Sequence, residues 1–572
     1  MGLRLASTLA ILFLFGLIYA VVFTIGIWFL PSDWVGLTLM VVFTILIVLF
    51  QYGISPLIIR WIYRIDWLPY EEFASMYPHL GNMIDKIVEV QDIKTPQFGI
   101  IDDGNPNAFT FGWSKNSARV VITTGIIRFL NKEEQSAVVA HEMGHVVHND
   151  FILMTVVFAI PLILLTIARW SYYAVRFSSG SKSRDSDSGG YIGLALLAVS
   201  LISYVSYYIG YLVSLFVSRI REYYADQHSA EVLENPNYLS TALVKIAYGL
   251  VAVQPGIDVK ERNKSKVRAL RGLGIFDPKK AKQIAVQGID GEGNYSKEVI
   301  QAAAGWDLFN PWAKYFQFFS THPLPAKRIK ALNEQCVQYN VPVEIDFSGA
   351  REIKEEQVGK SMAGEFLTDV IIKYLPSMVF WVFIALTIVW FFAFIGWLSL
   401  GSLITLSTLT LMWAIGFYIM GFAVIGRTKF MYRSGFEPKT VVDLVTQINV
   451  SPIRPIPAVV EGVIIGKGAP GYYFSDDLFF QDNTGLMYID YRFGLRIVDF
   501  FWAITKVNRL INQRVRIRGW YRRGPSPYIQ IDRLETMGGK TYRNFSKHAT
   551  YLLAVVFFLI GAFLFYLYFT AF

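Results

Sequence analysis

The sequence is poor in cysteine and in charged residues. Cys336 is the one cysteine among 572 residues, so the chain can form neither an internal disulfide nor a cysteine metal cluster. Only 17% of the residues are charged, whereas 53% are hydrophobic and 16% are aromatic. Because soluble proteins of this length rarely have such a composition, we expect the chain to cross a membrane. The chain also has no Walker-type phosphate loop, which argues against ATP dependence.

The sequence contains long runs of apolar residues. Seven runs are long enough to cross a bilayer as helices, and none has a charged residue in its interior. They lie near residues 6–30, 35–58, 151–169, 191–217, 374–398, 402–425 and 549–571. The first run is too long for a signal-peptide core and lacks a small-residue cleavage site after it, so we expect a retained anchor. The absence of interior charge argues against a transporter or a proton relay.

Basic residues flank these runs mainly on one side. With a cytoplasmic N-terminus, the cytoplasmic flanks hold Arg4, Arg60, Arg64, Arg427, Lys429, Arg433, Arg543 and Lys547. The positive-inside rule therefore predicts that the polar segments 59–150, 218–370 and 426–548 are cytoplasmic. The loop after the third run is an exception, because it is basic but falls on the outer side by this count.

The last polar segment differs from the other two. Segments 59–150 and 218–370 have mainly helical patterns, with a strand-like piece in the first. Segment 426–548 contains short β-type runs separated by turn signals, among them AVVEGVIIG, LMYIDY and RVRIRGWY. A helical pattern, VDFFWAITKVNRLINQ, lies between the third and the fourth run. The order β-β-β-α-β-β predicts a small OB-like barrel.

The hexapeptide AHEMGH, residues 140–145, is the first candidate for a metal site. Asn131 followed by Glu134 is typical of a helix N-terminus, so the hexapeptide is expected on a helix. His141 and His145 then share one face and are able to bind one ion. Glu142 lies beside them, where it can act as a general base. Two ordinary histidines on a helix remain the alternative for the hexapeptide alone.

A third ligand is expected, because catalytic zinc commonly has three protein ligands and a water. The helical pattern SRIREYYADQHSAEVL follows the fourth apolar run and places Glu222 and Asp226 on one face. The third and fourth runs form a hairpin, so His145 and Glu222 emerge on the same side of the membrane. Glu222 is therefore the natural third ligand, and Asp226 is placed to accept a hydrogen bond from a ligating histidine. A solvated surface charge is the alternative for Glu222.

Four motifs in this order resemble one family. NPNAFTFG with ARVVITTGIIRFLNKEE, then AHEMGHVVHND, then SRIREYYAD after a membrane hairpin, and finally STHPLPAKRIKAL are similar to the integral-membrane zinc metallopeptidases of the HtpX and CAAX prenyl protease family. The resemblance covers about 59–335, while 250–312 and the residues beyond about 370 fall outside it. The HtpX-like quality-control branch fits the core better than the CAAX-processing branch, and the C-terminal domain is an addition to both.

The resemblance implies a role for each matching residue. One Zn²⁺ per subunit would be held by His141, His145 and Glu222, with Glu142 as the base. His322 would stabilise the oxyanion, Arg328 would hold the surrounding carboxylates or the substrate backbone, and Asp226 would support a ligand. An extended substrate would pair with Asn107, Ala108, Phe109, Thr110, Phe111 and Gly112 by edge-strand addition. Judged from the residues alone, His322 before a proline is equally a turn residue, and we interpret His148 and His228 as structural.

The predicted fold class is a mainly α-helical multi-pass membrane protein with about seven transmembrane helices. It includes a cytoplasmic zincin-type α+β protease domain and a small all-β, OB-like C-terminal domain. The predicted division is 1–58 (two membrane helices), 59–150 (first protease part, with the zinc helix), 151–217 (membrane hairpin), 218–370 (second protease part), 371–425 (membrane hairpin), 426–548 (OB-like domain) and 549–572 (last membrane helix).

The hypothesis that follows is a zinc endopeptidase of the cell membrane. It would hydrolyse peptide bonds of membrane or unfolded proteins on the cytoplasmic side, in protein quality control. A catalytically silent scaffold that acts through the OB-like domain is the alternative, and the presence of Glu142 counts against it. RVRIRGWYRRGPSPY also fits a nucleic-acid surface, but a basic face near anionic lipids, or a domain that gates or recruits substrate, is favoured. Protein substrates and the lipid bilayer are the expected partners; the oligomeric state and a divalent metal other than zinc stay open.

Overall fold

The computed structural model describes residues 56–178, 188–251, 295–359, 361–394, 405–491 and 496–571, with isolated residues before 56. The predicted membrane runs near 6–30 and 35–58 therefore lie almost wholly outside the described residues. The chain divides into two compact units. Unit 1 contains 1–246, 314–345 and 470–473, and unit 2 contains 247–313, 346–469 and 474–572.

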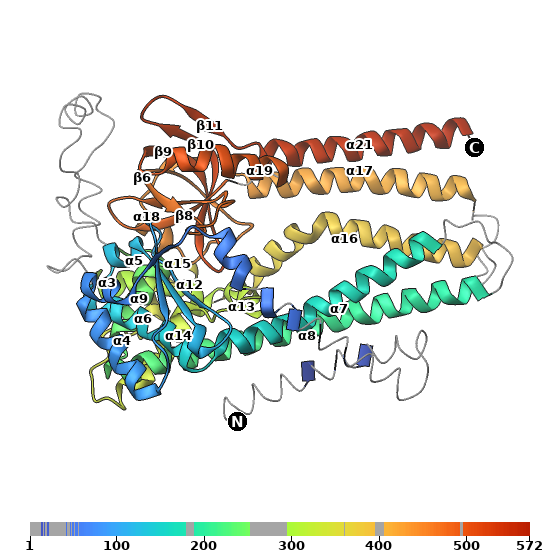
Figure 1. Ribbon diagram of the computed structural model, residues 1–572. Coiled ribbons are helices and arrows are strands. Elements are labelled where there is room, and N and C mark those ends of the chain that lie inside the picture. Colours follow the sequence, from blue (N-terminus) through green and yellow to red (C-terminus); the bar gives the residue numbers. More distant parts are fainter. Residues whose placement is uncertain are drawn as a thin grey trace. The chain divides into compact units, whose positions relative to one another are not determined.

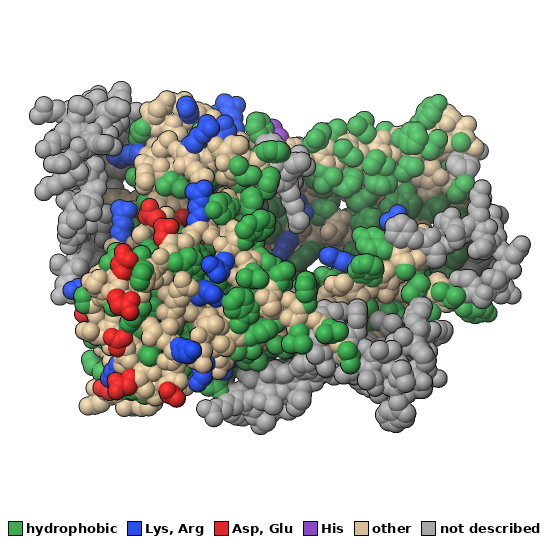
Figure 2. All heavy atoms as spheres, viewed as in Figure 1, with side chains coloured by type: hydrophobic (Ala, Val, Ile, Leu, Met, Phe, Trp, Pro, Cys, Tyr) green, Lys and Arg blue, Asp and Glu red, His purple; other side chains and the backbone are tan. Residues whose placement is uncertain are grey.

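Five helices among the described residues are long and apolar enough to cross a membrane. They are α7 (Asp150–Ser178), α8 (Ser188–Leu233), α16 (Ala363–Phe394), α17 (Leu406–Met431) and α21 (Ser546–Ala571), and each overlaps one of the last five predicted runs. On the visible face, hydrophobic side chains cover most of α17 and α21 (Figure 2). The sidedness of these helices stays a prediction.

In unit 1, α7 and α8 form the predicted hairpin, and α8 extends well beyond it (Figure 1). The two helices pack through a core that contains Val157, Leu164 and Val217. The hydroxyl of Ser214 donates a hydrogen bond to the Val157 carbonyl over 2.9 Å. With 46 residues, α8 is about 69 Å long at 1.5 Å per residue, roughly twice the hydrocarbon thickness of a bilayer. Its last part therefore extends beyond the hairpin, where it can pack with the rest of unit 1.

The remainder of unit 1 contains a four-stranded sheet covered by helices. The strands are β1 (Asp66–Leu68), β2 (Gln97–Ile101), β3 (Ala108–Phe111) and β4 (Arg119–Thr123), in the order β1-β2-β4-β3. The helices include α3 (Tyr70–Met76), α4 (Pro78–Gln91), α5 (Thr124–Phe129), α6 (Lys132–Val147), α9 (Asn237–Tyr248) and α14 (Pro325–Cys336). One core joins the sheet to α3, α4 and α6 through Phe73, Ile84, Phe98, Val120 and Met143. This arrangement leaves β3 at the edge of the sheet.

Unit 2 contains the predicted β-barrel. Its strands are β6 (Ile456–Lys467), β7 (Leu478–Gln481), β8 (Leu486–Asp490), β9 (Arg514–Arg523) and β10 (Pro527–Thr536). The pairings β6-β7-β8-β10-β9-β6 close a ring, with β8 and β10 parallel. The short strands β5 (Glu437–Pro438) and β11 (Thr541–Arg543) extend the sheet. Helix α19 (Arg496–Trp502), a π-helical turn (Ala503–Val507) and α20 (Asn508–Leu510) lie between β8 and β9. This order confirms the barrel prediction.

Helices from the middle of the chain also belong to unit 2. They are α12 (Lys297–Phe309), α15 (Ala350–Val358) and α18 (Val441–Val445); α13 (Pro311–Phe318) begins there and continues into unit 1. The indole of Trp306 donates to the Val450 carbonyl over 2.8 Å, and Leu486 N–H donates to the Gly249 carbonyl over 2.8 Å. The part of the segment 250–312 that contains α12 thus packs against the C-terminal part of the chain in unit 2.

Candidate active site

The helix that carries AHEMGH is fixed at its start by the predicted capping box. Glu134 N–H donates to Asn131 Oδ1 over 2.8 Å, and Asn131 N–H donates to Glu134 Oε2 over 2.9 Å. Later in the helix, Gly144 permits close contact with α8, because a Cβ at this position would lie 3.1 Å from Ala225 Cα and 3.0 Å from His228 Cβ. The close packing of α6 and α8 brings both predicted ligand groups together.

His141, His145 and Glu222 form one cluster. One ligand atom from each of the three residues lies within 4.8 Å of the others. His141 Nε2 lies 3.7 Å from Glu222 Oε2, and His145 Nε2 lies 3.8 Å from Glu222 Oε1. His141 and Glu222 are buried, while His145 is partly exposed. The geometry therefore brings together the three residues that the sequence predicted as ligands.

A second carboxylate holds the other nitrogen of each histidine. His141 Nδ1 lies 3.0 Å from Asp226 Oδ1, and His145 Nδ1 lies 2.8 Å from Asp150 Oδ2. Burial opposes protonation of His145, but Asp150, Glu222 and Glu142 raise its pKa to about 9. Metal-ligating histidines usually have such partners, which fix the ring orientation. The donor set and the negative surroundings both fit a divalent cation.

Asp150 was missing from the predicted site. It is the first residue of α7, and Asn149 just before it has a left-handed φ of 57° that turns the chain back toward α6. The Arg221 guanidinium binds the opposite oxygen of Asp150. The signal was present in the string HVVHND, a carboxylate shortly after the second histidine, but its direction depends on that turn.

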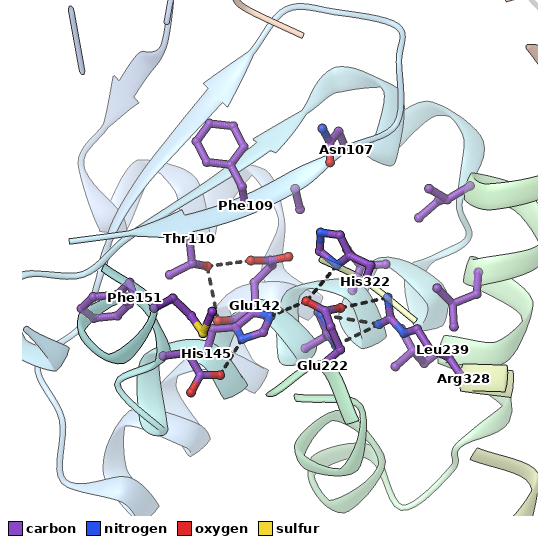
Figure 3. A pocket seen from close by; sticks show the side chains of 17 residues that line it. Asn107, Phe109, Thr110, Glu142, His145, Phe151, Glu222, Leu239, His322 and Arg328 are labelled. Carbon is purple, nitrogen blue, oxygen red and sulfur yellow. Dashed lines mark hydrogen bonds and ion pairs between the residues drawn. The ribbon is translucent and has the colours of Figure 1, made fainter. Parts of the chain in front are cut away.

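Glu142 lies in the same cavity and is oriented by β3. The Thr110 hydroxyl donates to Glu142 Oε2 over 2.7 Å (Figure 3). The cavity has a volume of 500 Å³ and is lined by the three clustered residues, Glu142, His322 and Arg328, among others. Of the predicted substrate residues, four line it: Asn107, Ala108, Phe109 and Thr110. Phe111 lies in a separate core cluster with Ile101 and Val121, and Gly112 is not among the lining residues.

His322 and Arg328 both reach Glu222. His322 Nδ1 lies 2.9 Å from Glu222 Oε1, and Glu222 raises the pKa of the His322 ring, which is more than half exposed. Arg328 Nη1 lies 3.1 Å from Glu222 Oε2, and Arg328 Nε donates to Asp226 Oδ2 over 2.9 Å. Burial opposes the charge of Arg328, but Asp226 and Glu222 raise its pKa further. The guanidinium therefore contacts both carboxylates.

His148 and His228 lie outside this cluster. The centroids of their two rings lie 5.9 Å apart. Neither residue lines the cavity that contains Glu142. Burial lowers the pKa of His148. This placement agrees with a structural interpretation of both residues.

The site and the fold together define a membrane metalloprotease, and comparison with known proteins agrees. The family model Peptidase family M48 matches residues 76–336. The chain is 38% identical to "Protease HtpX homolog" of Methanothermobacter thermautotrophicus over 257 residues, which cover 44% of this chain and 89% of the relative. It is 30% identical over 345 residues to "Protease HtpX homolog" of Pyrococcus furiosus, with 59% and 98% covered.

A third relative, "Protease HtpX homolog" of Thermococcus sibiricus, is 26% identical over 337 residues, which cover 58% of this chain and 96% of the relative. No solved structure matches the chain. The chain belongs to the HtpX-like proteases of peptidase family M48. The β-barrel lies outside the segment that matches the family model and is an addition to the protease core.

Proposed function

We propose that this protein is a zinc-dependent endopeptidase that cleaves membrane or unfolded proteins on the cytoplasmic side of the cell membrane, in protein quality control. The observation that carries the proposal is the cluster of His141, His145 and Glu222 beside Glu142 in one cavity. In our proposal the first three residues hold one Zn²⁺ per subunit. Asp226 and Asp150 fix the two histidine rings.

Zinc, when bound at such a site, acidifies a water molecule and polarises a peptide carbonyl. Glu142 accepts the proton of the attacking water and then delivers it to the leaving amine. The Thr110 hydroxyl keeps one oxygen of Glu142 in place during both transfers. His322, at the exposed side of the cavity, donates a hydrogen bond to the developing oxyanion. Water attacks directly, so the reaction needs no nucleophilic side chain.

The edge position of β3 supports the proposed mode of substrate binding. β3 pairs antiparallel with β4 on one side, and three of its residues, Ala108, Phe109 and Thr110, line the cavity. An extended peptide that pairs with the other side of β3 would run beside Glu142. Such pairing reads mainly the peptide backbone and tolerates many sequences. This tolerance suits a protease that acts on unfolded segments.

The proposed orientation and role have separate support. The basic flanks of the apolar runs favour cytoplasmic polar segments. The helix α8 leads directly from its apolar part to Glu222, so the site lies close to the membrane surface. The quality-control role rests on the resemblance of the four motifs to the HtpX-like branch, and the relatives bear the name "Protease HtpX homolog".

The arginines of the barrel strand β9 argue against a nucleic-acid function. Arg516 lies 3.3 Å from Glu461, and Arg518 pairs with Asp532. Arg522 and Arg523 are buried and donate to backbone carbonyls. Most of the charges that suggested a phosphate-binding surface are thus engaged within the domain.

The test is cleavage of an unfolded model substrate by the purified, detergent-solubilised full chain. We expect cleavage with zinc, none with a chelator, and none with Glu142→Gln. Zinc stoichiometry is measured on the same samples. A wild-type protein that binds no zinc would overturn the ligand assignment. A protein that binds zinc and cleaves neither the unfolded protein nor a membrane-protein substrate would favour the silent scaffold.

A further inference from the structure

Helix α19 and the π-helical turn after it present large apolar side chains to the outside. Phe501 is 59% exposed, and Phe500 and Ile504 are each 45% exposed. Phe474 stacks on Phe500 at 5.3 Å and is also exposed. The four side chains come from two separate segments of unit 2, and we name them the α19 patch. Contiguous exposed apolar patches usually mark a protein or membrane contact.

The opposite face of the same helix is firmly packed. Trp502 stacks on Tyr491 at 3.5 Å and donates its indole N–H to the Asp476 carbonyl over 3.1 Å. Val507 and Leu510 are fully buried farther along. The outward direction of the α19 patch is therefore set by a well-held inner face.

The packing also places α19 beside the start of a membrane helix. The ring centroids of Trp502 and Tyr542, in β11, lie 5.3 Å apart. The Tyr491 hydroxyl donates to the Arg543 carbonyl over 3.3 Å. Tyr542 and Arg543 lie shortly before Ser546, where the membrane helix α21 begins. Figure 1 draws α19 next to the near ends of α17 and α21. Helix α19 therefore lies close to the residues that lead into the first turn of α21.

We propose that α19 lies on the membrane surface and inserts the α19 patch between the lipid headgroups and the upper acyl chains. The partner is the lipid bilayer itself. Two further features support a bilayer over a protein partner. The barrel is tethered to the membrane on both sides, by α17 before it and α21 after it. The exposed residues change from apolar to polar along the helix, from Phe501 to Asn508 and Arg509.

This gradient has a geometric consequence. The stretch around Phe501 lies deepest, and the end of α20 rises into water, where Arg509 and Lys506 meet anionic headgroups. With α17 and α21, α19 gives the barrel domain a third point of contact with the bilayer. Three points fix the rotation of the domain about its tethers, which two adjacent helices alone do not.

The experiment measures depth directly in the full chain. Cys336, which is buried, is replaced by Ala, and single nitroxide labels are placed by Phe501→Cys, Ile504→Cys and Asn508→Cys. The proteins are reconstituted in nanodiscs that contain anionic lipid. For each nitroxide label, the rate of collision with oxygen, which partitions into lipid, is compared with the rate of collision with a water-soluble nickel chelate. Asn508 is the matched control, because it is an exposed residue of the same helical segment.

We expect the labels at 501 and 504 to collide mainly with oxygen, at a depth of about 5–10 Å below the phosphates. The label at 508 should collide mainly with the nickel chelate. Equal exposure of 501 and 508 to the nickel chelate would overturn the proposal and leave the patch in water. Protection of 501 and 504 from both reagents would also overturn it and would point to a protein partner. The result does not depend on the proteolytic activity.

Discussion

The Thr110 hydroxyl donates a hydrogen bond of 2.7 Å to Glu142 Oε2, and so connects the edge strand of the sheet to the proposed general base. The same threonine lies in the strand β3, which we propose as the docking site for the substrate backbone. The residue that orients the base is therefore part of the element that positions the scissile bond. A shift of β3 on substrate binding would be transmitted to Glu142 directly.

Replacement of Thr110 by Val removes this hydrogen bond and keeps the shape and β propensity of the side chain. A hydrogen bond to a charged group contributes about 1.5–3 kcal/mol, so kcat should fall by about tenfold to a hundredfold with little change in KM. Thr110→Ser, which keeps the hydroxyl, should retain most of the activity. Steady-state kinetics on a peptide substrate measure both constants. A rise in KM with unchanged kcat would instead make Thr110 a residue that only binds substrate.

Glu142→Gln should abolish proteolysis without loss of the metal. The amide cannot accept the proton of water, and a general base typically contributes about 10²–10⁴ in rate. Zinc content by elemental analysis should stay the same, because Glu142 is not among the three clustered ligand residues. Glu133→Gln is the matched control, since Glu133 is an exposed residue of the same helix. Loss of zinc in the Glu142 variant alone would show that this residue acts as a ligand.

Asp150→Asn tests the partner of His145 that the structure adds to the site. The amide keeps the size of the side chain but loses the charge that orients the imidazole and binds Arg221. Loss of such a partner usually lowers metal affinity by about 10–100-fold. Competition with a chromogenic chelator measures the zinc affinity, and Asp66→Asn on the exposed side of β1 is the control. Equal affinity in both variants would restrict Asp150 to a structural role.

The sequence predicted those features that depend on local spacing. The interval from His141 to His145 places both rings on one helix face, and the hairpin of α7 and α8 returns Glu222 to the same side. Short β-type runs separated by turn signals likewise predicted the barrel strands. The membrane runs before residue 56 lie almost wholly outside the described residues, so their number and the orientation of the chain stay predictions.

The features that the sequence did not predict depend on long-range contacts or on one backbone turn. The position of Asp150 follows from the left-handed conformation of Asn149, which no repeat or spacing signals. The bond from Thr110 to Glu142 joins two elements that are distant in sequence. The contacts of α12 with the barrel include buried contacts of Arg523, which in the sequence is one of several arginines in a basic stretch.

Arg523→Met tests whether this association holds unit 2 together. The guanidinium donates to the Val445 carbonyl over 2.8 Å and to the Ala303 carbonyl over 3.0 Å, and it lies 3.5 Å from Asp307. It also lies over the rings of Tyr248 and Trp306. Removal of one partner of a buried ion pair commonly costs about 3–5 kcal/mol. Unit 2 should therefore unfold at a clearly lower temperature.

The measurement is thermal unfolding of the detergent-solubilised chain, with limited proteolysis to locate the first cuts. Arg514→Met is the control, because Arg514 is an exposed residue of the same strand. Arg523→Lys should rescue little, since an ammonium cannot reproduce the planar set of donors that reaches two carbonyls and a carboxylate. We expect early cuts near α12 and in the barrel only in the Arg523 variants. An Arg523→Met protein as stable as the Arg514 control would mean that apolar packing alone joins α12 to the barrel, because the ionic contacts would then contribute no net stability.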